Sequence, residues 1–593
     1  MGMTAVDYLI VAGYFATMLV IGLLHMKKAS VSVRSYFLGG HKIPWWILAM
    51  SSSMSSIDIT GTMVNVSIFY FMGVRSFWYN IWMVCLVALA CHLGRWVRRS
   101  NVVTAAEWMS TRFGGGAAGE LARMTIAVVS MGTLIGYVAY AYVGVGKFVS
   151  WFAPPVHPDP EMNAQILGIL VIAFTALYAM LGGLFSVAYT DLIQTFILFL
   201  TSVYISITAF FTLGPEFIAA HTPAGWDSWW PTARIDYMAD KAMAGYPEGA
   251  WELFWPWVMM WCFQTLLAFF SGPGVGQGMQ FMLSTKSARD TCKQGMGMNI
   301  LSFPRWTLVV GITMLALATP GVDITDTDMV LPQMINTILP WGIKGFVLVG
   351  FLAAFMSTFS ISINNGTSYV IRDIYTRHIR PRAGRKEFLI ITYISSVLFV
   401  TVGILLGTTM HSALELGVWV FMILGGSMLV PLVLRWYWWR FNGWGFAFGM
   451  LAAFAMALIQ KVIQVNYGYV WPDYAFYFLM TGVSFVVAVT VTLLTPPTDR
   501  ETLLEFYRKI HPAGFWRPVQ RAVMERWPDH AREKMFGWDM LNCAVGAVSL
   551  FCLNMMPVFF MLHNWPMFWK MSLVFALTAG IMYRTWYRKL PND

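Results

Sequence analysis

The chain has 593 residues, of which 58% are hydrophobic and only 11% are charged. A soluble protein of this size carries roughly twice that charged fraction, so the composition excludes an ordinary soluble domain and indicates a polytopic membrane protein. The formal net charge of +10 could suggest nucleic acid, but the basic residues cluster in short loops between apolar segments. Orientation signals of membrane proteins lie in such loops, and we expect no nucleic-acid partner.

The six cysteines fall singly along the chain, mostly in or beside apolar segments. They predict no disulfide framework and no metal-binding motif. The N-terminus lacks the basic region and cleavage site of a signal peptide, so we expect the first apolar segment to be retained as a helix.

A membrane span requires about 20 mostly apolar residues, and this criterion predicts an all-α polytopic membrane protein with about 15 transmembrane helices. In chain order the predicted spans cover residues 5–25, 44–70, 74–94, 120–152, 163–181, 185–212, 252–281, 296–318, 341–371, 387–408, 412–437, 443–463, 474–495, 538–561 and 565–586.

Basic residues decide the predicted orientation, because Lys and Arg are enriched in cytoplasmic loops. They follow the first, third, seventh and ninth spans, which places all of these loops on one side. The longest loop of the other side, 213–250, holds only Arg234 and Lys241 against five acidic residues. We therefore expect a protein of the plasma membrane (the inner membrane in a bacterium) with its N-terminus outside and its C-terminus in the cytoplasm.

Residues 496–536 form a predicted cytoplasmic insert of mixed charge. Within it, Glu505–Lys509 is typical of an amphipathic helix, and no kinase, nucleotide-binding or Gly-rich phosphate motif is present. We predict that the insert lies on the membrane face and packs beneath the helix bundle.

Two predicted spans contain segments that interrupt a helix. The second span has five serines within residues 51–56, and the seventh has Ser-Gly-Pro-Gly-Val-Gly-Gln-Gly at 271–278. Serines weaken a helix and supply hydroxyls to the freed backbone. Either segment alone could be a packing face of small residues, but matched interruptions in two halves indicate an inverted-repeat secondary transporter with its site between them.

A candidate cation site lies in the ninth predicted span. Ser357 and Thr358 follow Ala354 by three and four residues, so on a helix both hydroxyls lie beside the Ala354 carbonyl. Three neutral oxygens inside lipid suit a small hard cation that has lost its water, and sodium is the natural candidate. The alternative is that both hydroxyls only bond back to the preceding turn.

Ionisable side chains inside predicted spans are costly and often functional. Asp58 follows the serine-rich interruption, and Arg305 lies twelve residues after Lys293, about 18 Å along a helix and thus near mid-membrane. Asp58 and Arg305 could pair in the empty state and open toward hydroxyls or a carboxylate of a solute. The alternative is a permanent structural ion pair. Asp191, at the start of the sixth span, is either functional or only interfacial.

Several short motifs occur in order between residues 1 and 440. They are Tyr36-Phe37-Leu38-Gly39-Gly40, Pro44-Trp45-Trp46, Thr104-Ala105-Ala106-Glu107-Trp108, Arg112-Phe113-Gly114, Leu181-Gly182-Gly183, Tyr189-Thr190-Asp191 with Gln194, Ala353-Ala354-Phe355-Met356-Ser357-Thr358 and Asp373-Ile374-Tyr375. In these motifs the chain resembles the sodium/solute symporter family of sodium-coupled glucose, galactose, proline and sialic acid carriers.

The resemblance implies a leucine-transporter-type core of two inverted five-helix repeats, formed by predicted spans two to eleven. Three regions follow from it. Residues 1–43 are an extra N-terminal helix with its cytoplasmic loop, 44–440 are the transport core, and 441–593 are extra C-terminal helices with the insert at 496–536.

The resemblance also implies residues of a sodium site. The implied ligands are Ala354, Ser357 and Thr358 on the eighth core helix and the backbone carbonyls of Ser51 and Met54 in the interrupted first core helix. Because this chain is a few residues shorter before Ser51 than the sugar carriers, Met54 and Ile57 form the alternative carbonyl pair. Asp191 matches an acidic residue near the sodium exit path.

The implied solute site is less closely matched. In the sugar carriers, a lysine and a glutamine that touch the sugar fall close to Arg305 and Asp58, and a gating tyrosine falls at Phe270. Asn80 and Trp261 complete the predicted solute-binding set. The third span offers no clear acidic sugar contact, so a neutral monosaccharide such as galactose is not specifically predicted.

We therefore predict a sodium-coupled symporter, with Na+ as coupling ion, that imports a small polar organic solute across the lipid bilayer. A sugar or sugar acid is the first expectation, an amino acid or monocarboxylate the second and a proton-coupled variant the third. A sensor with a transporter fold is the alternative from another class. No nucleophile–base or metal-ligand constellation indicates an enzyme, and no obligate protein partner is evident.

Overall fold

A computed structural model describes residues 3–29, 33–55, 57–102, 104–241, 246, 248–272, 277–319, 327–382, 384–410, 412–426, 428–469, 471–528 and 536–590. This part of the chain is almost entirely helical and contains no β-strand, only two isolated β-bridges. The all-α fold class is thereby confirmed.

The helices are α1 (Ala5–Ala29), α2 (Val33–Leu38), η1 (Gly39–His41), α3 (Trp45–Met54), α4 (Ile59–Met72), η2 (Gly73–Leu86), η3 (Leu89–Leu93), α5 (Gly94–Ser100), α6 (Ala105–Phe113), α7 (Ala117–Ser150), α8 (Pro160–Thr212), α9 (Pro215–His221), η4 (Asp236–Met238), α10 (Phe254–Ser271), α11 (Gln277–Ser284), α12 (Ala288–Ile300), α13 (Pro304–Leu317), η5 (Thr327–Met329), α14 (Val330–Ile338), α15 (Ile343–Tyr369), η6 (Val370–Ile379), α16 (Arg385–Gly407), α17 (Ala413–Gly417), η7 (Val418–Leu424), α18 (Leu429–Tyr437), α19 (Gly443–Tyr467), α20 (Asp473–Leu494), α21 (Arg500–Ile510), α22 (Arg517–Arg526), α23 (Phe536–Met561), α24 (Trp565–Thr585) and η8 (Tyr587–Lys589).

Among the described residues, 13 helices are long and apolar enough to cross a membrane, against about 15 predicted spans. The difference arises at two places. The predicted span 44–70 is divided into α3 and α4, and α4 continues into η2 as one apolar segment. The predicted span 412–437 is divided into the short helices α17, η7 and α18.

The chain turns between α4 and η2 at Gly73, whose φ is +65°. Asn80 Nδ2 donates a hydrogen bond of 2.5 Å to Asn65 Oδ1, across a sequence separation of 15. Residues that far apart on one straight helix are separated by about 22 Å, so η2 folds back along α4. This turn lies where the second predicted span ends and the third begins.

Helix α8 has 53 residues and covers two predicted spans, 163–181 and 185–212. Its ring at Phe174 lies 4.6 Å from that of Phe15, while Gln194 Nε2 donates to the Tyr14 hydroxyl at 2.8 Å. Two positions so far apart on α8 contact adjacent residues of α1, which a straight helix rising about 1.5 Å per residue cannot do. The helical segment therefore reverses between them and supplies two spans.

Both predicted interruptions coincide with helix ends. Helix α3 ends at Met54, and Asp58 is extended (φ −128°, ψ 167°) as the N-cap of α4. Helix α10 ends at Ser271, followed by Gly272 with φ +77°, and α11 begins at Gln277. Residues 273–276 of the second interruption lie outside the described residues.

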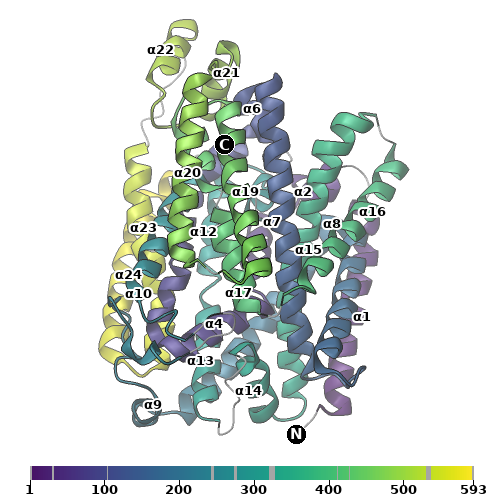
Figure 1. Ribbon diagram of the computed structural model, residues 1–593, viewed down its shortest axis with the longest axis vertical. Coiled ribbons are helices and arrows are strands. Elements are labelled where there is room, and N and C mark those ends of the chain that lie inside the picture. Colours follow the sequence, from purple (N-terminus) through teal and green to yellow (C-terminus); the bar gives the residue numbers. More distant parts are fainter. Residues whose placement is uncertain are drawn as a thin grey trace.

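Helix α15 is the centre of the bundle, and nearly all of its residues are buried against α8, α7 and α1. A helix enclosed on all sides can be apolar all round, which its sequence is. Helix α24 is the opposite case, because only 6% of its span is buried and its apolar residues face outward, as toward lipid. Figure 1 shows α24 at the edge of the bundle.

The molecule has two distinct ends along its long axis (Figure 1). The N-terminus, α9 and α14 lie at one end, and α6, α21 and α22 lie at the other. The loops rich in basic residues meet at this second end: Arg98 donates to the Thr285 carbonyl at 3.0 Å and Arg99 to the Ile510 carbonyl at 3.2 Å. These loops, predicted to share the cytoplasmic side, therefore lie together.

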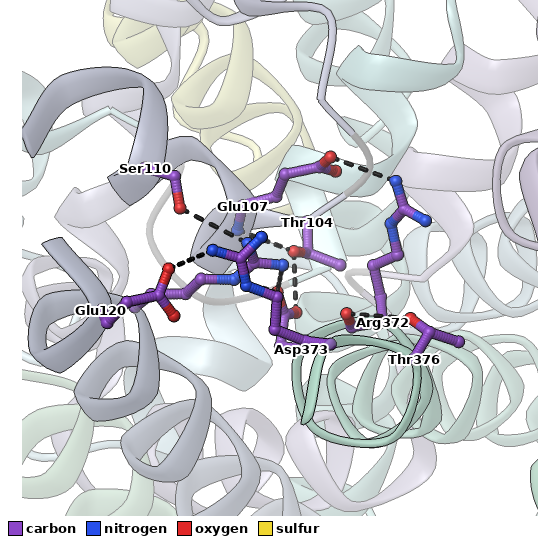
Figure 2. A network of polar contacts seen from close by, with 9 residues as sticks. Thr104, Glu107, Ser110, Glu120, Arg372, Asp373 and Thr376 are labelled. Atoms are coloured by element: carbon purple, nitrogen blue, oxygen red, sulfur yellow. Dashed lines mark hydrogen bonds and ion pairs between the residues drawn. The ribbon is translucent and has the colours of Figure 1, made fainter. Parts of the chain in front are cut away.

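A buried network joins two of these loops to α7 (Figure 2). Asp373 accepts hydrogen bonds from Thr104 Oγ1 at 2.8 Å and from Arg123 Nη2 at 2.7 Å. Beside them, Arg372 pairs with Glu107 at 3.2 Å. The network fixes α6 to α7 and to η6, which follows α15 directly.

Candidate functional site

The hydroxyls of α15 lie next to the first interruption. Thr358 Oγ1 donates to the Ala354 carbonyl at 3.1 Å, as its spacing predicts, and to the Ile57 carbonyl at 3.3 Å. The second contact crosses from α15 to the extended segment between α3 and α4. Backbone freed by the interruption and side chains of the central helix therefore share one site.

Asp191 lies at the same place, and its side chain is completely buried inside the protein. Its Oδ2 accepts a hydrogen bond from Ser51 Oγ, and the Ser357 hydroxyl lies close to the same carboxylate. Asp191 Oδ1 and Ser357 Oγ are buried without a hydrogen-bond partner of normal geometry among the described residues. Unpaired buried oxygens are costly, and a cation compensates for them.

The oxygen set fits a small hard cation. Hydroxyl, carbonyl and carboxylate oxygens are the ligands that such cations prefer, and these lie at the interruption of a helix. The resemblance implies the backbone carbonyls of Ser51 and Met54 as sodium ligands. Both carbonyls accept a backbone hydrogen bond of 2.9 Å, Ser51 from Ser55 N and Met54 from Ile57 N. The contact of Thr358 with Ile57 favours the alternative pair, Met54 and Ile57. The sodium-ligand set stays a prediction.

A second cluster surrounds Gly61, in the first turn of α4. Asp58 Oδ1 accepts from the Gly61 amide, and Asp58 Oδ2 accepts from the Tyr137 hydroxyl at 2.9 Å. A methyl group placed on Gly61 would lie 2.5 Å from Asp58 Oδ1, 3.2 Å from the Tyr140 hydroxyl and 3.4 Å from Arg305 Nη2. These polar groups therefore converge on the face of α4 that Gly61 leaves open.

Arg305 approaches this cluster from the start of α13. Its side chain is buried, and it faces Asp58 as the sequence predicts. Asn80 joins through Asn65, whose amide also donates to the Gly61 carbonyl. The cluster thus combines a carboxylate, a guanidinium and two carboxamides.

The predicted aromatic residues separate into two places on α10. Trp261 packs edge-to-face on Tyr79 at 5.6 Å, and Tyr79 in turn lies close to Arg305 and Asp58. Phe270 lies about 13 Å further along the same helix, where its ring contacts Tyr437 of α18 at 5.6 Å. The structure therefore groups Trp261 with the solute cluster and places Phe270 beyond it, toward the end of the molecule that holds α21.

Sequence reasoning missed Gly61 and Asn65. The signal was their spacing, because positions 58, 61 and 65 are three and four apart and share one helix face. Tyr137 and Tyr140 reach the cluster from α7, which packs against α4.

Two interrupted helices around buried polar clusters define a secondary transporter of the inverted-repeat class. The family model of the sodium:solute symporter family matches residues 36–453. The chain belongs to this family, as its motifs predict, and Na+ is the coupling ion of the family. Its members are transporters rather than enzymes.

Curated relatives and a solved structure agree with this assignment. The sodium/mannose cotransporter SLC5A10 of Bos taurus is 24% identical, over 93% of this chain and 96% of the relative. The sodium/myo-inositol cotransporter 2 of Oryctolagus cuniculus is also 24% identical, over 84% of this chain and 78% of the relative. The fold is similar to that of a Na+-coupled sialic acid symporter in a substrate-bound outward-open state, with a TM-score of 0.64, 18% identity and coverage of 84% of this chain and 99% of that one. The predicted leucine-transporter-type fold is confirmed.

Proposed function

We propose that the protein imports a polyhydroxylated solute, a sugar or sugar acid, together with sodium by alternating access. The observation that carries the proposal is the buried cluster of Asp58, Arg305, Asn65 and Asn80 beside the first interrupted helix. The names of the curated relatives, which are mannose and myo-inositol cotransporters, support the same solute class.

The chemistry of the cluster suits a polyol. A carboxylate accepts hydrogen bonds from two neighbouring hydroxyls, and a guanidinium donates two in a fixed fork. Carboxamides donate and accept, so they bind hydroxyls in either role. Trp261 and Tyr79 supply aromatic rings on which the apolar face of a sugar ring can pack.

Coupling follows from the adjacency of the two sites. The Ile57 carbonyl contacts Thr358, and the next residue, Asp58, belongs to the solute cluster. Tyr137 links them a second time, because its hydroxyl donates to Asp58 and lies beside Thr358. A sodium ion that orders Ile57 and Thr358 therefore also positions Asp58, and each ligand then raises the affinity for the other.

We propose the same division of the chain and the same orientation in the membrane that the sequence predicts. The transport core is residues 44–440, with an extra helix before it and the segment 441–593 after it. The protein lies in the plasma membrane, or the inner membrane of a bacterium, with the N-terminus outside and the basic end, including α21 and α22, in the cytoplasm.

A second candidate solute is an amino acid. Asp58 and Arg305 carry opposite charges and lie in the same cluster. The ammonium group of an amino acid could bind the Asp58 carboxylate while its carboxylate binds the Arg305 guanidinium. The charge pair alone does not distinguish this solute from a sugar acid, whose carboxylate would bind Arg305.

Uptake by proteoliposomes tests the proposal. Purified protein is assayed with labelled mannose, myo-inositol, sialic acid and proline, each with an inward sodium gradient, with potassium in its place, and with a proton gradient alone. We expect sodium-driven accumulation of a sugar, inositol or sugar acid. Accumulation of proline only would assign the second candidate, and uptake indifferent to sodium would reject symport.

A further inference from the structure

The insert between α20 and α23 contacts the transport core at α5, at α6 and at one end of α18. Phe515 N donates to the Tyr437 carbonyl at 2.7 Å, and Phe515 forms an isolated parallel bridge with Trp438. Trp516 Nε1 donates to the Trp436 carbonyl at 2.7 Å, and the Trp516 side chain is fully buried. We call Phe515 and Trp516, with the Phe506 ring that stacks on Trp516, the insert latch.

The residues held by the latch contact the second interrupted helix. Trp436 Nε1 donates to the carbonyl of Ser271, the last residue of α10, at 2.9 Å. Tyr437 packs on Phe270, its neighbour. A short chain of direct contacts therefore connects the insert to the end of α10, on the side of the solute cluster nearest α21.

Arg112 of α6 joins the latch to α18. Its guanidinium donates to the Arg435, Trp438 and Phe441 carbonyls, each at 3.0 Å. The same guanidinium lies 4.8 Å from the Trp516 ring centroid and 5.3 Å from that of Phe506. One buried cation thus holds the end of α18 and the insert together.

Whereas Arg112 stabilises the contact between α18 and the insert, burial of Arg435 destabilises the packed arrangement of α18. It is completely buried over the rings of Trp108 at 4.5 Å and Trp436 at 5.3 Å, and none of its three guanidinium nitrogens has a hydrogen-bond partner among the described residues. Burial of a cation without hydrogen-bond acceptors is unfavourable, and water relieves it. Separation of α18 from α6 would admit water to Arg435, so this charge favours the open arrangement.

We propose that the insert latch closes the route between the solute cluster and the end of the molecule that holds α21. We also propose that Arg435 favours the opening of this route. The end of α18 is then a two-state element. The latch and Arg112 stabilise the closed state, and hydration of Arg435 stabilises the state in which α10 is released. Trp516 is a positioning residue, because it acts on the path through Trp436 and touches neither sodium nor solute.

A cysteine at Leu93 reports on this opening. Leu93 is buried at the second interruption, 3.5 Å from the place where a side chain on Gly272 would begin. Purified full-length protein in detergent carries Leu93→Cys with the exposed Cys262 replaced by serine, and the rate of maleimide labelling is measured. The same background without Leu93→Cys gives the blank.

Two variants are expected to move the labelling rate in opposite directions. Trp516→Phe keeps the stacking but loses the hydrogen bond to Trp436, and should label about fivefold faster, the effect of one net hydrogen bond. Arg435→Met should label slower. Trp527→Phe is the matched control, since Trp527 is an insert tryptophan that stacks on Arg508 and Arg526; its rate should be unchanged.

A wild-type rate in Trp516→Phe, or an equal acceleration in Trp527→Phe, overturns the proposal. If Trp516→Phe shows no thermal unfolding transition, Arg435→Met decides alone, and an unchanged or faster rate in it overturns the proposal. The inference rests on the proposed alternating access, but labelling requires no sodium gradient and no known solute. Failure of the proposed transport is therefore visible only in uptake, and failure of the latch only in labelling.

Discussion

Ser357 and Thr358 differ in their hydrogen bonding, although they are neighbours on one helix. Thr358 bridges two carbonyls, whereas Ser357 Oγ makes no hydrogen bond of normal geometry among the described residues. If both ligate sodium, Ser357→Ala and Thr358→Ala should each raise the sodium concentration for half-maximal uptake about tenfold, the loss of one ligand oxygen. Solute recognition at saturating sodium should change less.

The controls for this prediction lie on the same helix. Thr358→Ser keeps the hydroxyl and should restore sodium affinity, and Ser368→Ala removes a buried hydroxyl that donates to the Asn365 carbonyl. An unchanged sodium requirement in both alanine variants would place the sodium site elsewhere.

Arg305 is predicted to bind solute rather than only to balance Asp58. Arg305→Ala should abolish the thermal stabilisation produced by solute while sodium still stabilises the protein. A permanent structural pair predicts otherwise, because a stranded buried carboxylate costs about 3–5 kcal/mol and the double variant Arg305→Met, Asp58→Asn would recover folding and transport. Transport by that double variant at the wild-type rate would refute the binding role.

The predictability of single residues depends on how local their geometry is. The spacing of Ala354 and Thr358 predicts their contact, because both lie on one helix and the helix fixes it. The Asp191 contact with Ser51 joins residues 140 positions apart, and only family resemblance brought Asp191 near the sodium site. Arg435 carries no sequence signal, since its lack of hydrogen-bond partners among the described residues is a consequence of packing alone.

At the scale of elements, Gly73 sets the turn between α4 and η2. With φ +65°, a Cβ at this position would lie 2.0 Å from the Trp226 carbonyl oxygen, to which Val74 N donates. Gly73→Ala should therefore destabilise the protein by about 2 kcal/mol or more, through backbone strain and overlap with fixed backbone. Thermal unfolding in detergent measures the loss of stability. Gly13→Ala in α1 is the control, because a Cβ at Gly13 would have no neighbouring atom within 4 Å.

Helices with uniform apolar composition were predicted well and irregular ones were not. The two interruptions were visible because Ser, Gly and Pro weaken a helix locally. The division of 412–437 into α17, η7 and α18 was not predicted, although Gly425 and Gly426 stand between η7 and α18. The π-helical turns of η7 itself have no such signal, since they arise from tertiary contacts within apolar sequence. The same holds for the pairing of the insert with α18, which joins segments distant in sequence.

At the scale of the whole molecule, the loop charges assign each end to one side of the membrane. Arg and Lys of four loops meet at the end that holds α6, α21 and α22, while the loop 213–250 belongs to the other end. The orientation with the basic end outside would require many Lys and Arg side chains to cross the bilayer, which is energetically unfavourable. The basic end is therefore expected in the cytoplasm.

Cysteine accessibility in intact cells tests this orientation. Asp240 is exposed in the loop of the N-terminal end, and Gly384 is exposed beside α16 at the basic end. In a background with Cys262→Ser, Asp240→Cys should react with a membrane-impermeant maleimide added outside, and Gly384→Cys should react only after the membrane is permeabilised. Both sites are solvent-exposed, so a difference in their labelling reports the side of the membrane rather than burial. Labelling of both from the same side would contradict the topology, and labelling of Gly384→Cys alone from outside would invert it.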